Sequence, residues 1–312
     1  MKTVVIALGG NAMLQPGQKG DFEVQLENVK AAIKEIHAIH RAGYRVVLTS
    51  GNGPQVGAIK LQNQSAASVS PEMPLYACGA MSQGLIGYMM VQELRNAFRS
   101  QKEATQCIGC LTQTLVDSGD PAFAAPSKPM GRFYTEEEAR AMMAKDSTIM
   151  MKEDAGRGWR VVVPSPRPVE ILEYPMIKKL VDDGVIVICT NGGGIPCKLE
   201  GERIVGVDAV IDKDMATSLL AQKLNSDYLL ILTDVPYATI NYRTSDQQEI
   251  KTVTVEEMMK LEQEGHFKDG SMKPKVRAAI EFTMKTGNPS IITSLTSAFD
   301  ALEGNCGTRI VQ

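Results

Sequence analysis

Short runs of β-branched and aliphatic residues alternate along this chain with longer segments of helical periodicity. Such alternation indicates parallel strands that are covered on both faces by helices. It predicts an α/β fold, a three-layer αβα sandwich around a mainly parallel open sheet of about eight strands. Strands are expected at residues 3–8, 44–49, 107–111, 185–189, 228–232, 290–293 and 309–311.

Two long helices are the clearest helical predictions, at residues 22–41 and 74–99. In the first, Val29, Ile33 and Ile36 fall on one face, and Gly43 stands where a glycine commonly ends a helix. Histidines on this helix have apolar neighbours, so they are poor candidates for catalysis.

Residues 117–168 interrupt the alternation with six of the 15 prolines and the single tryptophan, Trp159. Short strand candidates lie there at residues 149–152 and 160–163. We interpret the segment as a small, lid-like subdomain that protrudes from the carboxyl edge of the sheet. A boundary near Asn225 would separate an N-terminal lobe, residues 1–224, from a C-terminal lobe, residues 225–312.

Composition excludes several classes of protein. The 33 lysines and arginines against 36 acidic residues give a net charge of −3, which offers no general attraction to nucleic acid or an anionic membrane. No apolar run approaches the roughly 18 residues that a membrane span needs, so we expect a cytoplasmic protein. Six cysteines are too few for a disulfide scaffold, and Cys107 and Cys110 form a lone CxxC pair. We assign no metal ligands.

Glycine-bearing turns follow several of the expected strands. The carboxyl ends of parallel strands form the ligand crevice of an open sheet, and glycines there let backbone N–H groups approach an anion. Several such turns at one edge favour a phosphate site over simple chain reversal. The turns are Gly9-Gly10-Asn11, Gly51-Asn52-Gly53, Gly192-Gly193-Gly194 and, in a later loop, Gly270-Ser271.

Two common phosphate-binding motifs do not fit. A P-loop needs Lys and then Ser or Thr after its second glycine, but Gly84 is followed by Leu85. Gly51, Gly53 and Gly57 form GxGxxxG after a strand, yet the acidic residue that a dinucleotide fold needs about 20 residues later does not follow a strand here.

Lysines supply the positive charge that a phosphate site requires. Lys213, followed by Asp214, opens one expected helix, Lys275 lies where another opens, and Lys128 is in the proline-rich segment. An ammonium beside a carboxylate near a helix N-terminus suits a migrating phosphoryl group. Any one of them alone would be read as a surface lysine. Since no nucleophile is framed convincingly, direct in-line transfer follows.

An ordered set of motifs resembles the carbamate kinases, a branch of the amino acid kinase family, from residue 3 to about 311. The motifs are GGNA at 9–12, SGNGPQVG at 50–57, KPMGRFY at 128–134, NGGGIP at 191–196, VDAVIDKD at 207–214, LTDV at 232–235 and GSMKPK at 270–275. Other members of the wider family carry Lys-x-Gly-Gly on the first strand. Ala7 takes the place of that lysine here, as in carbamate kinases.

The resemblance implies reversible phosphoryl transfer between ATP and carbamate, running mainly toward ATP synthesis in arginine breakdown. The cofactors would be ATP or ADP with Mg²⁺, and the enzyme would be a homodimer. Lys128, Lys213 and Lys275 would surround the transferred group, with Asp214 orienting lysines. The carbamoyl phosphate side would use Gly9, Gly10, Asn11, Gly51, Asn52 and Gly53. The nucleotide side would use Thr233, Asp234, Tyr242, Ser271, Met272 and Lys275.

Two alternatives remain at this point. The chain could phosphorylate another small carboxylate such as acetylglutamate. Ala7 argues against this alternative. The chain could also be a catalytically silent sensor of carbamoyl phosphate or nucleotide. The intact set of Lys128, Lys213, Asp214 and Lys275 argues against such a loss of activity.

Overall fold

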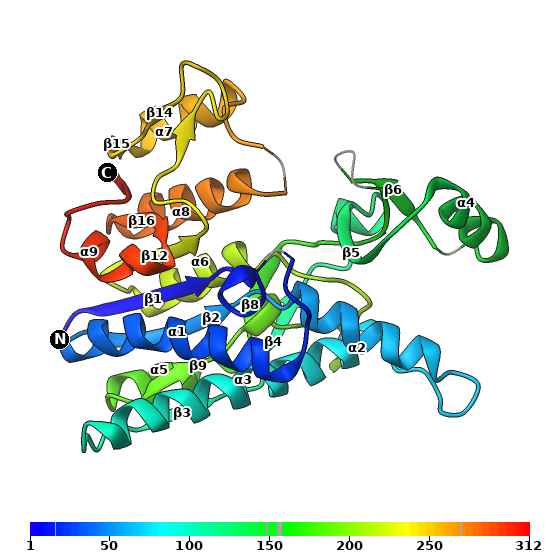
Figure 1. The fold of residues 1–312 in the computed structure, drawn as a ribbon, viewed down its shortest axis with the longest axis horizontal. Coiled ribbons are helices and arrows are strands. Elements are labelled where there is room, and N and C mark those ends of the chain that lie inside the picture. Colours follow the sequence, from blue (N-terminus) through cyan, green and yellow to red (C-terminus); the bar gives the residue numbers. More distant parts are fainter. Residues whose placement is uncertain (16, 148, 155–157, 269) are drawn as a thin grey trace.

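An eight-stranded sheet forms the centre of the molecule (Figure 1), whose computed structural model describes residues 1–15, 17–147, 149–154, 158–268 and 270–312. Neighbouring strands run parallel except β16 and β17. The predicted fold class is therefore confirmed. In order across the sheet, the strands are β15 (Thr252–Thr254), β17 (Thr308–Val311), β16 (Ser290–Ser294), β12 (Tyr228–Thr233), β1 (Thr3–Leu8), β2 (Arg45–Ser50), β9 (Ile186–Ile188) and β3 (Cys107–Gly109).

Helices cover both faces of this sheet. One face packs against α1 (Phe22–Arg41), α3 (Leu75–Ser100) and α9 (Ala298–Leu302). The other packs against α5 (Tyr174–Asp182), α6 (Lys213–Leu224), α7 (Val255–Gln263) and α8 (Met272–Thr286). The two long helices predicted from periodicity match α1 and α3 to within one residue at each end, and Gly43 follows the end of α1 with φ of 94°.

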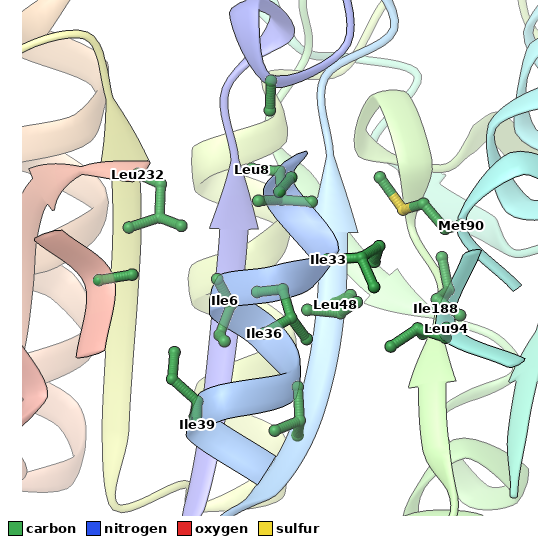
Figure 2. Packing of buried hydrophobic residues seen from close by; sticks show 14 of the residues in the cluster. Ile6, Leu8, Ile33, Ile36, Ile39, Leu48, Met90, Leu94, Ile188 and Leu232 are labelled. Atoms are coloured by element: carbon green, nitrogen blue, oxygen red, sulfur yellow. The ribbon is translucent and has the colours of Figure 1, made fainter. Parts of the chain in front are cut away.

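The alternation of side chains along β1 explains why the strand is apolar at every position from Val4 to Leu8. Ile6 and Leu8 point into the cluster with α1, whereas Val5 and Ala7 point into the opposite cluster. Figure 2 shows Ile33 and Ile36 of α1 packed over Ile6 and its neighbours on the sheet. Burial of each such side chain contributes about 1.5–3 kcal/mol, so these strands hold their carboxyl ends in fixed positions.

A second sheet of four strands was not predicted from the sequence. Its order is β11 (Arg203–Gly206), β10 (Ile195–Glu200), β4 (Gln113–Val116) and β8 (Pro168–Ile171). β4 and β8 are antiparallel neighbours, and Val116 pairs with Pro168. The proline-rich segment therefore leaves and re-enters the body between two paired strands.

That segment folds into a small unit that projects from the body (Figure 1). It contains the 3₁₀ turn η2 (Pro121–Phe123), helix α4 (Glu136–Lys145) and a sheet in the order β5 (Lys128–Tyr134), β7 (Trp159–Val163) and β6 (Met151–Glu153). A capping box formed by Thr135 and Glu138 starts α4. We call residues 117–167 the protruding subdomain.

The remaining elements are short or lie near the sheet edge. They are η1 (Gly10–Ala12), α2 (Gly53–Ser65), η3 (Asn191–Gly193), β13 (Thr239–Ile240), β14 (Gln248–Glu249) and η4 (Leu295–Ser297). Within the described residues, no helix combines the length and the apolar character needed to cross a membrane.

Candidate active site

Two adjoining cavities open at the carboxyl ends of the central strands. The first cavity, about 330 Å³, is bordered by the ends of β1 and β12 and the start of α8. The second cavity, about 200 Å³, lies between the turn after β2, the start of α6 and the protruding subdomain. Gly10, Gly270, Ser271 and Lys275 line both, so the two cavities share a wall.

The residues predicted to bind nucleotide all line the first cavity: Thr233, Asp234, Tyr242, Ser271, Met272 and Lys275. Sequence reasoning missed Val235, Thr239 and Lys268 in the same lining. Val235 is the last residue of the LTDV motif, and no motif marks the other two. Their place in the cavity depends on how the loops after β12 and before α8 fold back.

Most of the residues predicted for the other substrate line the second cavity. Gly10, Gly51, Asn52 and Gly53 do so together with Lys128, Lys213, Asp214 and Lys275. Gly9 instead lines the first cavity, beside Thr233. The backbone of Asn11 lies in η1, but the side chain of Asn11 is outside the described part of the structure.

One buried carboxylate joins two of the predicted lysines. Asp214 is 2% exposed, and its two oxygens accept hydrogen bonds from different ammonium groups, Oδ1 from Lys213 and Oδ2 from Lys275 at 3.0 Å. The lysines come from α6 and α8, which pack against each other on the face of the sheet opposite α1. Asp214 and Lys275 are 61 positions apart in the sequence, and the fold brings them into one cluster.

Charge and burial act in opposite directions on this cluster. Burial disfavours the ionised Asp214, but attraction to Lys213 and Lys275 is stronger and holds its pKa well below the usual range. Burial lowers the pKa of Lys213, and repulsion by Lys275 adds to that effect. Burial also acts to lower the pKa of Lys275, but the carboxylates of Asp214, Asp212 and Asp234 together outweigh it, so that pKa is raised. Asp214 therefore remains ionised at neutral pH.

Asp212 fixes the start of α6 and contacts the protruding subdomain. Its Oδ1 accepts hydrogen bonds from the backbone N–H groups of Asp214 at 2.9 Å and Met215 at 3.3 Å, as an N-cap residue does. Its Oδ2 lies 2.7 Å from the Nζ of Lys128. Sequence reasoning placed Lys128 at the site but did not identify this partner.

Several glycines at the site are needed because other side chains approach them closely, and not only because the chain turns there. A Cβ at Gly51 would lie 3.2 Å from Cδ of Lys213, so the glycine leaves room for that side chain. Gly192 has φ of 69°, and a Cβ there would overlap the side chain of Asn52. Of the three glycines predicted as an anion turn, only Gly192 is part of the second cavity's lining.

Helix N-termini add to the positive character of the cavities. α2 begins at Gly53 in the lining of the second cavity, and α8 begins at Met272 beside the shared wall. The side-chain amide of Asn52 donates to Ser82 Oγ at 2.8 Å instead of capping α2. Unpaired N–H groups in a first helical turn bind anions such as phosphate.

Cysteines and histidines lie outside the two cavities, among the residues that the structure describes. Cys107 begins β3 and Cys110 follows it, and no group of three metal-ligating His, Cys, Asp or Glu side chains occurs in the described residues. His37 contacts Glu103 at 2.9 Å beside α3. The cavities thus offer ammonium groups, backbone N–H groups and carboxylates.

Comparison with known proteins agrees with this geometry. The pattern of the Amino acid kinase family matches residues 2–294. Carbamate kinase from Giardia intestinalis is 64% identical over 312 residues, covering 100% of this chain and 98% of its own. The chain belongs to the carbamate kinases of the amino acid kinase family.

Further carbamate kinases extend the match. The carbamate kinase from Pyrococcus horikoshii is 50% identical over 309 residues, with 98% of each chain covered. A solved structure of the carbamate kinase from Giardia lamblia bound to AMP-PNP superposes with a TM-score of 0.94, at 65% identity over 99% of this chain and 98% of that one. Ala7 is fully buried in β1 and faces the core.

Proposed function

We propose that this chain catalyses reversible phosphoryl transfer between ATP and carbamate, giving ADP and carbamoyl phosphate. The observation that carries the proposal is the cluster of Lys213, Asp214 and Lys275, all of which line the second cavity and of which Lys275 also lines the first. Its position suits a group that passes from one ligand to the other. The full-length identity to carbamate kinases supports the choice of carbamate as acceptor.

We assign the first cavity to the nucleotide and the second to carbamoyl phosphate. The first has the larger volume, and Tyr242 lies in its lining with Val235 and Met272, which suits a base and a ribose. The relative whose structure contains AMP-PNP supports nucleotide binding by this fold. The second is small, and its lining of glycines and lysines suits a small doubly charged anion.

The residues act by position and charge. Lys213 and Lys275 neutralise the oxygens of the phosphoryl group as it moves, because charge spreads over those oxygens in a loose transition state. Asp214 holds both ammonium groups in the second cavity, that of Lys275 at the shared wall, and balances part of their charge. Transfer then proceeds directly between the ligands: Asp214 is already bonded to two ammonium groups, and neither cavity has a histidine or cysteine among its described lining residues.

Mg²⁺ would accompany the nucleotide. The ion binds proteins through one or two carboxylates and the substrate's phosphates, and Asp234 is the carboxylate among the described residues that line the first cavity. This donor set fits an ion that is held mainly by phosphate oxygens and water. When bound, Mg²⁺ would neutralise charge on the β- and γ-phosphates.

The direction we propose is ATP synthesis from carbamoyl phosphate and ADP, at the end of arginine breakdown. Purified protein is mixed with carbamoyl phosphate and Mg·ADP, and ATP is read with luciferase, with acetyl phosphate as the control donor. Rapid ATP formation from carbamoyl phosphate alone is expected. ADP binding without ATP formation would contradict the proposal and favour the sensor, and ATP from acetyl phosphate would favour another carboxylate as acceptor.

We also propose a homodimer. Exposed apolar side chains gather beside β3, which is an edge strand of the central sheet: Tyr88, Ile108 and Leu111. A second copy would cover them and extend the sheet. Light scattering should give twice the chain mass, and Leu111→Arg should give the single mass. Leu199→Arg, an exposed leucine on β10, is the matched control.

A further inference from the structure

Lys128 reaches the second cavity on the strand β5 of the protruding subdomain, not on the body of the molecule. Its side chain is 34% exposed, and its ammonium lies 2.7 Å from Asp212 Oδ2. If the proposed function holds, this ammonium must leave water and face the phosphoryl group of carbamoyl phosphate. A long, partly exposed side chain needs a partner to keep it there.

Asp212 meets that need with a carboxylate that is itself fixed. Because its Oδ1 is occupied by the N–H groups of Asp214 and Met215, its other oxygen has a defined position at the edge of the cavity. That position belongs to the start of α6, which also carries Lys213. One side chain therefore sets the place of the subdomain's lysine relative to the body's lysines.

A contact between two glycines seats the strand that bears Lys128. A Cβ at Gly57 of α2 would lie 3.3 Å from Cα of Gly131, which has φ of 74° in β5. The pairing of β5 with β7 shifts register between Met130 and Tyr134, so Gly131 lies in an irregular stretch of the strand. This contact explains the third glycine of the GxGxxxG pattern, which no dinucleotide site accounts for.

We infer that Asp212 is a positioning residue for phosphoryl transfer, acting through Lys128, and that the contact of Gly57 with Gly131 seats the strand from which Lys128 extends. The inference rests on the proposed function. Before carbamoyl phosphate binds, Asp212 holds the ammonium at the cavity; afterwards the phosphoryl oxygens offer a second acceptor nearby. Lys128 then moves a short way between acceptors instead of being recruited from solvent.

A double-mutant cycle tests the role of Asp212. Asp212→Asn keeps a side-chain oxygen for the α6 cap but removes the charge that holds Lys128. We expect kcat/KM for carbamoyl phosphate to fall about tenfold, with the KM for ADP unchanged. In a Lys128→Met background the same substitution should cause no further loss, because the group it positions is gone.

Gly57→Ala tests the same idea from outside the cavity. Alanine suits the interior of α2, so the fold is kept, but the new methyl group pushes on Gly131. KM for carbamoyl phosphate should rise about threefold or more, with ADP binding unaffected. Gly79→Ala on α3 is the matched control, since a Cβ there meets no atom within 4 Å. It should behave as wild type.

The outcomes separate this inference from the proposed function. Wild-type protein that makes no ATP from carbamoyl phosphate contradicts the proposed function itself. Active wild type with losses that multiply in the Asp212→Asn, Lys128→Met double variant shows that Asp212 does not act through Lys128, which overturns the inference. Full activity of Asp212→Asn also overturns the inference. If Asp212→Asn does not fold, wild-type kinetics of Gly57→Ala overturns the inference instead.

Discussion

Lysines reach this active site from two regions, which differ in how firmly they hold the lysine side chains. Lys213 and Lys275 come from helices of the body, with side chains 12% and 15% exposed around a carboxylate that is 3% exposed. Lys128 comes from a three-stranded appendage, and its pair with Asp212 is 34% and 18% exposed. The body pair lies within the packing of α6 and α8, whereas the other depends on one ion pair and one glycine contact.

This difference follows from the desolvation cost of charge. Removing two ammonium groups from water is tolerable only where a carboxylate and a rigid scaffold compensate them, as Asp214 and the core helices do. A lysine that must meet a ligand entering from solvent cannot be enclosed in the same way. The body therefore holds Lys213 and Lys275 firmly in the lining of the second cavity, and the protruding subdomain contributes Lys128 to the same cavity.

The largest effect should come from the body. Lys213→Ala should lower kcat about 10³-fold with the fold retained, because the lost charge acts on the transition state. Lys223→Ala, an exposed lysine near the other end of α6, is the control and should have normal turnover. Steady-state kinetics and circular dichroism measure both. Near-normal turnover of Lys213→Ala would remove that lysine from the mechanism.

Removal of the subdomain should affect one ligand more than the other. Deleting residues 128–165 is structurally feasible because Lys128 pairs with Val163, so the chain ends left by the cut lie close together. We expect the KM for carbamoyl phosphate to rise about 100-fold while the ADP dissociation constant, measured by calorimetry, changes less than about twofold. Equal loss of both ligands would argue against a lid on the carbamoyl phosphate side.

Acid should weaken the body cluster. Since the folded-state pKa of Asp214 is held below its unfolded value, the carboxylate contributes stability above that unfolded value and loses it as pH falls toward the folded pKa. Between about pH 5 and pH 3, the unfolding free energy of wild type should fall about 1 kcal/mol more than that of Asp214→Asn. Urea unfolding at both pH values measures these free energies. Equal decreases in wild type and Asp214→Asn would contradict a stabilising ion pair at Asp214.

The smallest effect should come from cysteines away from both regions. Burial raises the pKa of the Cys107 and Cys110 thiols, so they are protonated and poor metal ligands. Cys107→Ser with Cys110→Ser should keep turnover within about twofold, with Mg²⁺ still the required ion. A stoichiometric zinc signal in wild type that the double variant loses would overturn this expectation.

The sequence was sufficient where short-range pattern decides the structure. Continuous apolar runs gave β1, β2 and β12, and the period of buried positions gave α1. Glycine turns after those strands indicated the crevice. The ordered motifs then brought Lys128, Lys213 and Lys275 to one site, and all three line the second cavity.

What the sequence did not predict depends on contacts between distant segments. Asp212 and Lys128 are 84 positions apart, and nothing in either motif marks them as partners. The four-stranded sheet joins strands of four to six residues whose pairing is set by tertiary packing. The glycine turn predicts an anion contact at Gly193, but the residue must be glycine because Ile211 approaches it closely.

The wall that the two cavities share has a consequence for inhibitor design. A compound joining an adenosine moiety to a carbamoyl phosphate mimic would place both halves in adjoining spaces across Gly10 and Lys275. Once the first half is bound, the second is present at an effective concentration on the millimolar scale or above. Such a tethered pair would gain affinity from geometry alone, and a linker too long or too short would forfeit that gain.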